Sequence, residues 1–281
     1  MKQIFLNLKR FDIPPELGGV NRLSPPLDWG RHIVRSVQDD LKRYDNELIG
    51  FTIFFPEAHI PGAVSALDAN SPIRIGCQSV HWDDTSVGGN FGAFTTSRTA
   101  NAMKALGCSS TIIGHCEERR NLQKIAQDFG VIGTDVINRI LNQKVLCAEK
   151  AGLKVLYCIG ETAEQQDKWS ETLLEQLITG LSGTNLKQIA IAYEPVWAIG
   201  PGKTPPGMDY IQTVTKLIQE AFENVPVVYG GGLKADNAAM LSSISEISGG
   251  LIALTRFTGS IGFYPEEYLE IIRIYMEETL Q

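Results

Sequence analysis

The sequence is poor in the features that mark membrane, nucleic-acid-binding and disordered proteins. No apolar segment among its 281 residues is long enough to cross a bilayer, and no signal-peptide core follows Met1. The net charge of −7 argues against a nucleic-acid surface. The chain has no low-complexity run, and its hydrophobic content of 43% is typical of a folded enzyme-sized domain. We therefore expect a cytoplasmic protein that binds neither a membrane nor nucleic acid.

Cysteine and histidine are too few and too scattered to indicate a disulfide framework or a zinc site. The five cysteines form an odd set and lack the paired spacing of metal ligands, and the four histidines show no paired spacing either. We expect reduced, mostly buried thiols, no metal and no cofactor. These residues are Cys77, Cys108, Cys116, Cys147 and Cys158, with His32, His59, His81 and His115.

Eight short apolar segments alternate with stretches that have the three- and four-residue spacing of amphipathic helices. The predicted strands are residues 3–7, 48–54, 73–77, 110–113, 154–158, 188–193, 227–229 and 250–254. No linker rich in proline or glycine divides the chain. The pattern predicts an α/β fold, a single (β/α)8 barrel domain over residues 1–281, with a last helix from about Pro265 to the C-terminus.

Polar groups suited to proton transfer follow three of these strands. Asn7 and Lys9 follow the first strand, His115 the fourth and Glu194 the sixth. Because barrel strands end at one face, we expect these groups to lie together. Taken singly, each has an ordinary explanation as a loop charge, a solvated lysine or a core histidine. Together they favour catalysis, with Glu194 removing a proton from carbon and Lys9 and His115 stabilising the oxyanion.

Glycines near these groups could bind an anion through backbone N–H groups. Residues 198–202 follow Glu194 and are predicted to close as a lid, which would exclude water and strengthen Glu194 as a base. Gly200 in this lid and the turn containing Gly231 and Gly232 are candidate phosphate contacts, although a merely flexible turn is the alternative. A nucleotide-binding P-loop is disfavoured because Trp197 stands where its first glycine is needed.

Several segments resemble the triosephosphate isomerase family, in the family's order and along nearly the whole chain. They are residues 7–9, 92–95, 111–120, 158–161, 192–204 and 229–231. The resemblance implies a TIM barrel in which Lys9 is the electrophilic lysine, His115 a neutral electrophile and Glu194 the base, as in the family's known chemistry. It also implies a small phosphorylated sugar as substrate, with Asn7 and Glu117 supporting the polar cluster. A homodimer is expected, in which Thr95 of one subunit supports the other subunit's site.

The chain departs from the family pattern at the expected phosphate end. Gly232 stands where the family has a serine, and Leu254 and Thr255 replace glycines after the eighth strand. Arg256 could take over phosphate binding, or it could be a surface ion-pair residue. Residues 10–28, 81–91 and 121–133 look like enlarged loops. Glu118 follows Glu117 where the family has arginine, so the ion pairs nearby must differ.

The leading hypothesis is an aldose–ketose isomerase that interconverts dihydroxyacetone phosphate and glyceraldehyde 3-phosphate through an enediolate. Because the phosphate end is altered, a related isomerase that acts on a longer ketose phosphate, such as erythrulose phosphate, is the alternative. A non-catalytic barrel that binds a phosphorylated metabolite is a third alternative, but it would not need a base over the substrate carbon. A metal-dependent hydrolase is disfavoured because the sequence lacks the expected ligand pairs.

Overall fold

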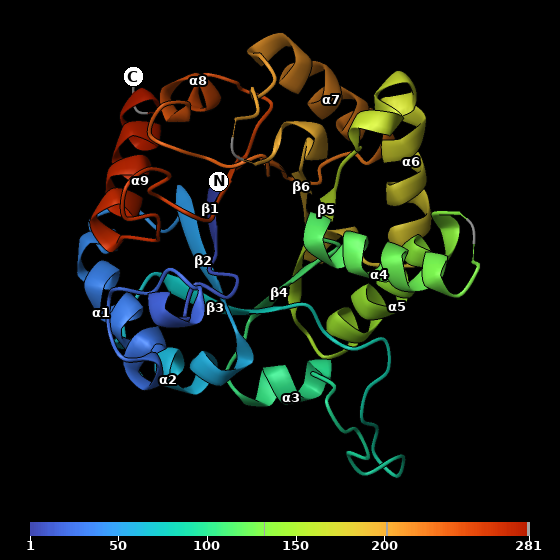
Figure 1. Ribbon diagram of the computed structural model, residues 1–281, viewed down its shortest axis with the longest axis horizontal. Helices are drawn as coiled ribbons and strands as arrows, with labels where there is room; N and C mark the ends of the chain where they lie inside the picture. Colours follow the sequence, from blue (N-terminus) through green and yellow to red (C-terminus); the bar gives the residue numbers. More distant parts are fainter. Residues whose placement is uncertain (132, 201, 280–281) are drawn as a thin grey trace.

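The computed structural model describes residues 1–131, 133–200 and 202–279. Its eight parallel strands form a closed barrel in chain order, and Figure 1 shows the helices arranged around this ring. The predicted fold class is therefore confirmed, and each predicted strand matches an observed one. The strands are β1 (Lys2–Asn7), β2 (Ile49–Phe55), β3 (Ile73–Gln78), β4 (Ser110–Ile113), β5 (Lys154–Ile159), β6 (Ile189–Tyr193), β7 (Val227–Tyr229) and β8 (Gly249–Ile252).

The helices follow the strands in the βα order that the spacing predicted. They are α1 (Trp29–Leu41), α2 (Ile60–Ser65), α3 (Ala100–Ala105), α4 (Cys116–Asp128), α5 (Asp135–Lys150), α6 (Trp169–Gly180), α7 (Met208–Ala221), α8 (Ala238–Ser242) and α9 (Pro265–Thr279). Short 3-10 helices are η1 (Pro15–Leu17), η2 (Pro26–Asp28), η3 (Glu57–His59), η4 (Ala163–Lys168), η5 (Leu186–Gln188) and η6 (Val196–Ala198). No helix of the described ranges is long and apolar enough to span a membrane.

Two apolar layers hold the barrel together, one inside the ring of strands and one between strands and helices. Inside, Phe5 and Phe54 stack with ring centroids 5.9 Å apart, so the interior is a packed core and not a channel. Outside, Ile33, Val37 and Leu41 of α1 are buried against the strands, as their spacing predicted. Each such side chain contributes roughly 1.5–3 kcal/mol through its burial.

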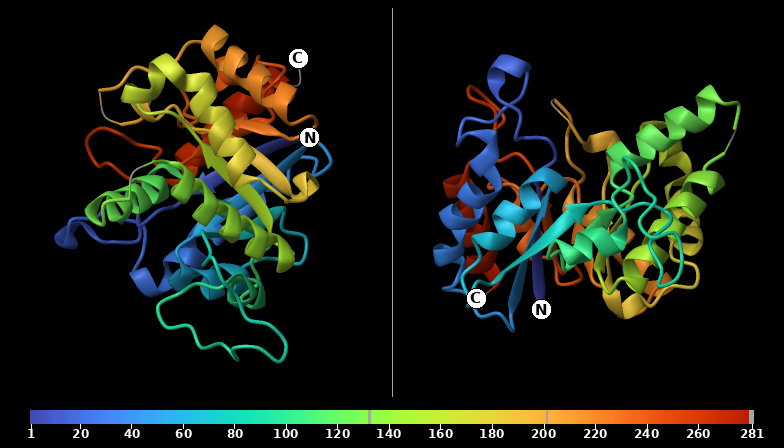
Figure 2. Two further views of the ribbon diagram at one scale, coloured as in Figure 1. Left: turned by 90° about the vertical axis from the view of Figure 1, so that its right-hand side faces the viewer. Right: turned by 90° about the horizontal axis from the view of Figure 1, so that it is seen from below.

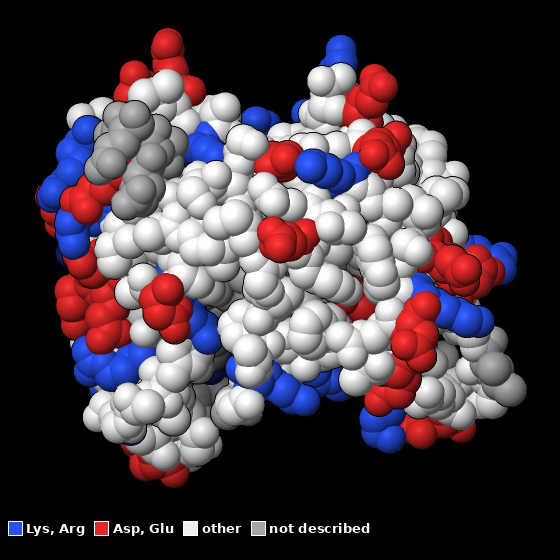
Figure 3. Space-filling model, turned by 90° about the horizontal axis from the view of Figure 1, so that it is seen from above, with Lys and Arg blue, Asp and Glu red and all other residues white. Residues whose placement is uncertain are grey.

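The helices turn their charged side chains outward. Figure 3 shows one side of the molecule, where acidic and basic side chains are mixed and lie mainly at the margins. On α1, for example, Arg31, Arg35 and Asp39 are exposed on the face opposite the buried stripe. This alternation of a buried stripe and a charged face is what fixes each helix on the barrel surface.

The closure of the barrel depends on a close approach of β8 to β1. Gly249 has φ 148°, and a Cβ atom at this position would lie 1.8 Å from the carbonyl oxygen of Gln3. Only glycine fits there. β8 ends at Ile252, two residues before the predicted end, and its pairing with β7 is confined to Tyr229 and Gly250.

The three segments predicted as enlarged loops differ from one another. Residues 10–28 contain η1 and η2 and are held to the barrel by Asp12, whose carboxylate lies 3.0 Å from His59 and 2.9 Å from Arg10. Residues 81–91 belong to a long connection between β3 and α3 that projects from the barrel (Figures 1 and 2).

The prediction of a loop over residues 121–133 was wrong for its first part. α4 continues to Asp128, because residues 121–128 contain no helix breaker and Lys124 pairs with Asp128 one turn later at 3.2 Å. Ile132, within the predicted loop, lies outside the described residues.

Candidate active site

A pocket of about 400 Å³ opens at the end of the barrel where the strands end. Its wall includes eight of the residues singled out from the sequence, namely Asn7, Lys9, His115, Glu117, Glu194, Gly200, Gly231 and Gly232. The structure thus brings together groups that are up to 225 positions apart in the chain, since the first is residue 7 and the last residue 232. Pro201, in the predicted lid, lies outside the described residues.

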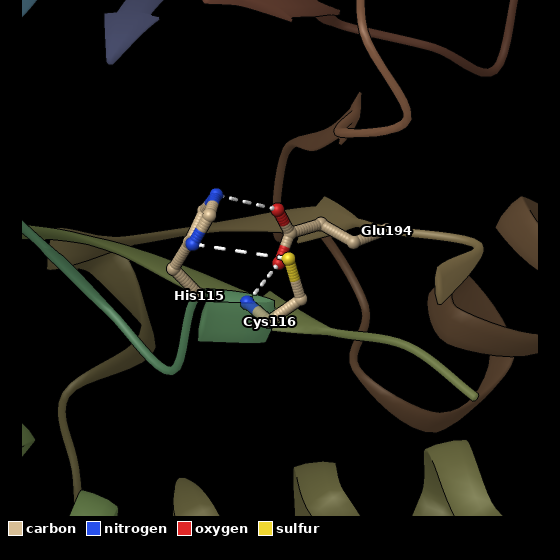
Figure 4. A group of neighbouring side chains, drawn as sticks. All are labelled: His115, Cys116 and Glu194. Atoms are coloured by element: carbon tan, nitrogen blue, oxygen red, sulfur yellow. Dashed lines mark hydrogen bonds and ion pairs between the residues drawn. The ribbon is translucent and has the colours of Figure 1, made fainter. Parts of the chain in front are cut away.

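His115 is fixed by the turn that joins β4 to α4. Gly114 makes this turn with φ 80°, and a Cβ atom there would lie 2.8 Å from the carbonyl oxygen of Cys158. His115 is then the N-cap of α4, and its Nδ1 accepts a hydrogen bond of 3.2 Å from the backbone N–H of Glu117. An accepting Nδ1 leaves the proton of a neutral imidazole on Nε2. This Nε2 lies 3.2 Å from Oε1 of Glu194 (Figure 4).

Glu194 follows β6 directly and is almost completely buried. Its Oε2 accepts a 2.8 Å hydrogen bond from the backbone N–H of Cys116, at the start of α4. Burial raises the pKa of the Glu194 carboxyl above 4.5, whereas His115 and the Cys116 N–H act in the opposite direction. A buried carboxylate with a raised pKa is a stronger base than a solvated one, which suits proton transfer from carbon.

Lys9 reaches the pocket through an unfavourable backbone conformation. Its φ of 42° costs a non-glycine residue roughly 1–3 kcal/mol. The conformation is held by Asn7, whose Oδ1 accepts a 3.1 Å hydrogen bond from the Lys9 N–H. Lys9 Nζ lies 2.8 Å from Oε1 of Glu117. Burial raises the pKa of the Glu117 carboxyl, but the hydrogen bond and charge of Lys9, with further positive charges nearby, together hold this pKa below its usual value. Strain of this kind is typical of functional positions.

Sequence reasoning missed Gln78, which holds the Lys9 segment from β3. Its Nε2 donates to the carbonyl oxygen of Lys9 at 3.0 Å and to Oδ1 of Asn7 at 3.3 Å. A glutamine at the end of a strand carries no special sequence signal. Its role depends on the β1–β2–β3 register, which only the folded barrel supplies.

A second missed group lies beneath the start of the predicted lid. Glu161 is fully buried, and its Oε1 accepts hydrogen bonds from Trp197 Nε1 at 2.6 Å, Tyr193 Oη at 2.8 Å and Tyr210 Oη at 3.2 Å. The pKa of Tyr210 is raised to about 12, first by burial and then by the Glu161 charge. Glu161 thus joins the end of β6, the residue directly before the predicted lid and α7. The sequence marked it only as part of the segment 158–161.

The ion pairs around Glu118 explain why glutamate is accommodated at this position. Its Oε1 lies 2.5 Å from Lys144 Nζ, and its Oε2 accepts a 2.7 Å hydrogen bond from the Gly114 N–H. The next residue, Arg119, donates to the carbonyl oxygens of Gly114 and Cys158 at 2.9 Å. Both charges support the turn that carries His115.

The opposite side of the pocket is lined by glycines, by two lysines and by apolar side chains. Gly232 has φ 101°, and within the described chain no protein acceptor is found for its N–H or that of Gly231. Lys203 and Lys234 also line the pocket, and Lys234 Nζ lies 4.3 Å from the ring centroid of Phe257. Neither lysine was singled out from the sequence, because isolated lysines in loops are usually solvated.

Two predicted residues lie away from this pocket. Arg256 does not line it: its guanidinium pairs with Glu267 at 2.5 Å and stacks 3.8 Å from the ring centroid of Tyr264. Of the two alternatives that the sequence left open, the geometry agrees with the surface ion pair. Thr95 is exposed on the projecting connection between β3 and α3.

The fold and the site define a (β/α)8-barrel protein with a buried carboxylate, a histidine held at the start of a helix and a lysine of positive φ at the strand ends. A model of the family described as triosephosphate isomerase matches residues 28–274. The chain belongs to the triosephosphate isomerase family.

Individual relatives agree with this assignment. The chain is 39% identical to the triosephosphate isomerase of Chlorobium luteolum over 214 residues, which cover 70% of this chain and 78% of that protein. It is 31% identical to that of Alkaliphilus metalliredigens over 251 residues, or 85% and 92% of the two chains. The crystal structure of triosephosphate isomerase from Bartonella henselae superposes with a TM-score of 0.73 at 26% identity, covering 98% of this chain and 99% of that one.

Proposed function

We propose that this member of the family is an aldose–ketose isomerase, which interconverts dihydroxyacetone phosphate and glyceraldehyde 3-phosphate through an enediolate. The observation that carries the proposal is the buried Glu194 carboxylate beside His115 Nε2, in the pocket that Lys9 also lines. A base, a hydrogen-bond donor and a cation around one cavity are what a proton transfer next to a carbonyl requires.

Glu194 removes the proton from carbon and returns it to the neighbouring carbon. It belongs to the wall of the pocket, and burial has already raised its pKa. Before it reaches the substrate, the carboxylate must leave the N–H of Cys116, to which Oε2 is bonded at 2.8 Å. Closure of residues 198–202 over the substrate would exclude water and favour this movement.

His115 and Lys9 stabilise the negative charge that develops on the substrate oxygens. Because Nδ1 accepts from the Glu117 N–H, the neutral imidazole offers its Nε2 proton to an enediolate oxygen. Lys9 adds a positive charge, and Asn7 keeps its backbone in place. The atoms balance without a cofactor: one proton moves between adjacent carbons, and the oxygens exchange the other.

The phosphate is proposed to bind at the N–H groups of Gly231 and Gly232, with Gly200 contributing from the lid. Backbone N–H groups without protein acceptors form an anion site when glycine allows close approach. Lys234 lines the same cavity. Its positive charge can bind the phosphate in place of the serine hydroxyl that Gly232 lacks. Phosphate binding by Arg256 stays a prediction that requires its ion pair with Glu267 to open.

A homodimer is proposed through the connection between β3 and α3. Residues on this projecting segment expose large apolar side chains, with Phe91 at 92% and Trp82 at 52% relative exposure. Such side chains are stabilised when a partner covers them. Thr95 lies on the same segment, in agreement with its expected role in the partner's site.

A longer ketose phosphate, such as erythrulose phosphate, is the second candidate substrate. Phe11 and Leu254 line the pocket, and the latter stands where the resemblance leads one to expect glycine. Residue changes of this kind at the phosphate end alter the position at which the phosphate binds while leaving Glu194 and His115 in place.

A substrate panel tests the proposal. Isomerisation of dihydroxyacetone phosphate should be compared with that of C4 and C5 ketose phosphates, in the presence of a chelator, by kcat/KM. The highest value for the triose supports the proposed substrate, and the highest value for the tetrulose phosphate supports the second candidate. Tight binding of these compounds with no turnover would instead favour a metabolite-binding barrel.

A further inference from the structure

Cys116 places a thiol in the pocket beside two of the groups assigned to catalysis. The side chains of His115, Cys116 and Glu194 are buried, and one potential ligand atom from each lies within 4.8 Å of the others. Figure 4 shows the three side chains converging from the start of α4 and the end of β6. The thiol has no part in the proton transfer, since Cys116 holds Glu194 only through its backbone N–H.

The distance between His115 Nε2 and Glu194 Oε1 is close to that between two ligands of a tetrahedral metal ion, while the thiol now lies at the other ring nitrogen. Nε2 of His115 lies 3.2 Å from Oε1 of Glu194, and Nδ1 lies 3.8 Å from Sγ of Cys116. Zinc bonded to nitrogen, oxygen and sulfur at the usual lengths separates its ligand atoms by roughly 3.3–3.7 Å. Oε2 of Glu194 would keep its bond to the Cys116 N–H while Oε1 binds the metal. Cys116 Sγ, which lies at Nδ1 in this structure, has to rotate toward Nε2 to complete the site.

The surrounding charges favour a cation in this position. Zinc at Nε2 would move the imidazole proton to Nδ1, where the bond from the Glu117 N–H would be lost. Oε2 of Glu117 lies 3.8 Å from Nδ1, however, and can accept that proton after a small movement. A carboxylate behind a zinc-binding histidine is a common supporting arrangement. The positive charge of Lys9 is already paired with Glu117 at 2.8 Å.

We propose that His115, Cys116 and Glu194 form a capture site for a thiophilic divalent ion such as Zn²⁺ or Cd²⁺, with water as the fourth ligand. Imidazole and thiolate ligands select these ions over Mg²⁺ and Ca²⁺, which prefer oxygen. The ion would occupy both the base and the oxyanion donor. If the proposed isomerase activity holds, the ion therefore inhibits it reversibly and competes with the substrate.

Metal binding can be tested without any assay of activity. Chelator-treated protein is titrated with Co²⁺ alone, and then with Zn²⁺ to displace it. We expect one equivalent of tetrahedral cobalt with visible absorption, and a near-ultraviolet band from the thiolate–cobalt bond. Cys116→Ser should abolish the near-ultraviolet band and weaken zinc binding by at least about 10- to 100-fold, the loss seen even for supporting groups. Cys147→Ser, a change of a half-buried thiol on α5, is the matched control and should keep both.

If Cys116→Ser does not fold, the wild-type protein and Cys108→Ser together still decide the question, because a band that persists in Cys108→Ser does not come from the Cys77–Cys108 pair. Absence of the thiolate band from the wild-type protein overturns the proposal. It is also overturned if the band survives in Cys116→Ser and disappears in Cys108→Ser, because the metal would then bind at the buried Cys77–Cys108 pair, whose thiols lie side by side. Zinc inhibition that is reversed by chelator and lost in Cys116→Ser would add the catalytic consequence. If cobalt binds with the thiolate band but zinc does not inhibit an active isomerase, the metal site stands and the catalytic roles of Glu194 and His115 are wrong; if no isomerase activity is found, the proposed function fails and the cobalt result still decides the metal site.

Discussion

On the β4–β6 side of the pocket, His115 and Glu194 are buried and bonded to the backbone of α4, so their positions are fixed by the barrel itself. On the side that follows β7 and β8, the wall includes glycine N–H groups and Lys234, together with apolar side chains such as Leu254. The first side is built for one reaction, because small shifts there would separate the base from the donor. The second side can change its residues without disturbing the first. Under the proposed function, the residues for the reaction and those that bind the phosphate thus follow different strands.

The strongest test of the β4–β6 side is Glu194→Gln. The change keeps size and hydrogen bonding but removes the base, so kcat should fall by roughly 10²–10⁴-fold while KM changes little. Steady-state kinetics on the best substrate of the panel measure both values. Glu223→Gln, on the exposed surface, should behave as the wild type. A near-normal kcat in Glu194→Gln would remove this residue from the reaction.

His115→Gln and Lys9→Met test how the remaining roles are divided. Loss of one oxyanion donor costs roughly 10²–10³-fold in rate, so His115→Gln should lower kcat and leave KM nearly unchanged. Lys9→Met should lower kcat and also raise KM, because the substrate is an anion. Lys124→Met, at an exposed position of α4, is the control. Similar small effects of both substitutions would contradict the division.

Lys234→Met tests the opposite side. A charge-assisted hydrogen bond to phosphate corresponds to a roughly ten- to hundredfold change in KM, with a smaller effect on kcat. Competition by inorganic phosphate should weaken in parallel. If the KM and the inhibition by phosphate both match the wild type, backbone N–H groups bind the phosphate without Lys234.

The acid limb of the pH profile reports the burial of Glu194. The base must be ionised, and burial raises its pKa, so kcat/KM should fall with decreasing pH at an apparent pKa above 4.5. The same shift affects stability: a carboxyl with a raised folded-state pKa favours folding at low pH, and this contribution is lost as pH rises through that pKa. The unfolding temperature of Glu194→Gln should therefore be higher than that of the wild type, and the difference should grow as the pH rises. A difference independent of pH would contradict the shift.

Arg256→Ala has the smallest expected effect. Because Arg256 is paired with Glu267 outside the pocket wall, KM should change by less than about threefold, within the range of surface substitutions. Arg256→Ala and Glu267→Gln should each lower the unfolding temperature slightly and to a similar extent, because each breaks the same ion pair. A roughly ten- to hundredfold rise of KM in Arg256→Ala alone would restore the phosphate contact considered from the sequence.

The sequence predicted the barrel and the residues at its strand ends because both depend on local patterns. Alternating apolar segments define the strands, and a polar residue directly after a strand must lie at the barrel end. Gln78, Glu161 and Lys234 could not be found this way. Their roles come from contacts between strands and loops far apart in sequence, such as the bond from Trp197 to Glu161. Likewise, Arg256 looked available for phosphate only because its partner Glu267, eleven positions later, had no visible link to it.

The short pairing between β7 and β8 predicts where the barrel opens first by local unfolding. With Tyr229 and Gly250 as its one paired position, this junction of the described barrel has fewer paired residues, and so a shorter ladder of hydrogen bonds, than the other junctions. Local opening requires the least free energy where such bonds are few, and amide hydrogens report it by exchange with solvent. Backbone amides of β7 and β8 should exchange before those of β1 and β2. A phosphate bound at Gly232, shortly after β7, would slow that exchange. The exchange rates of β7 and β8 would therefore report whether the phosphate site is occupied.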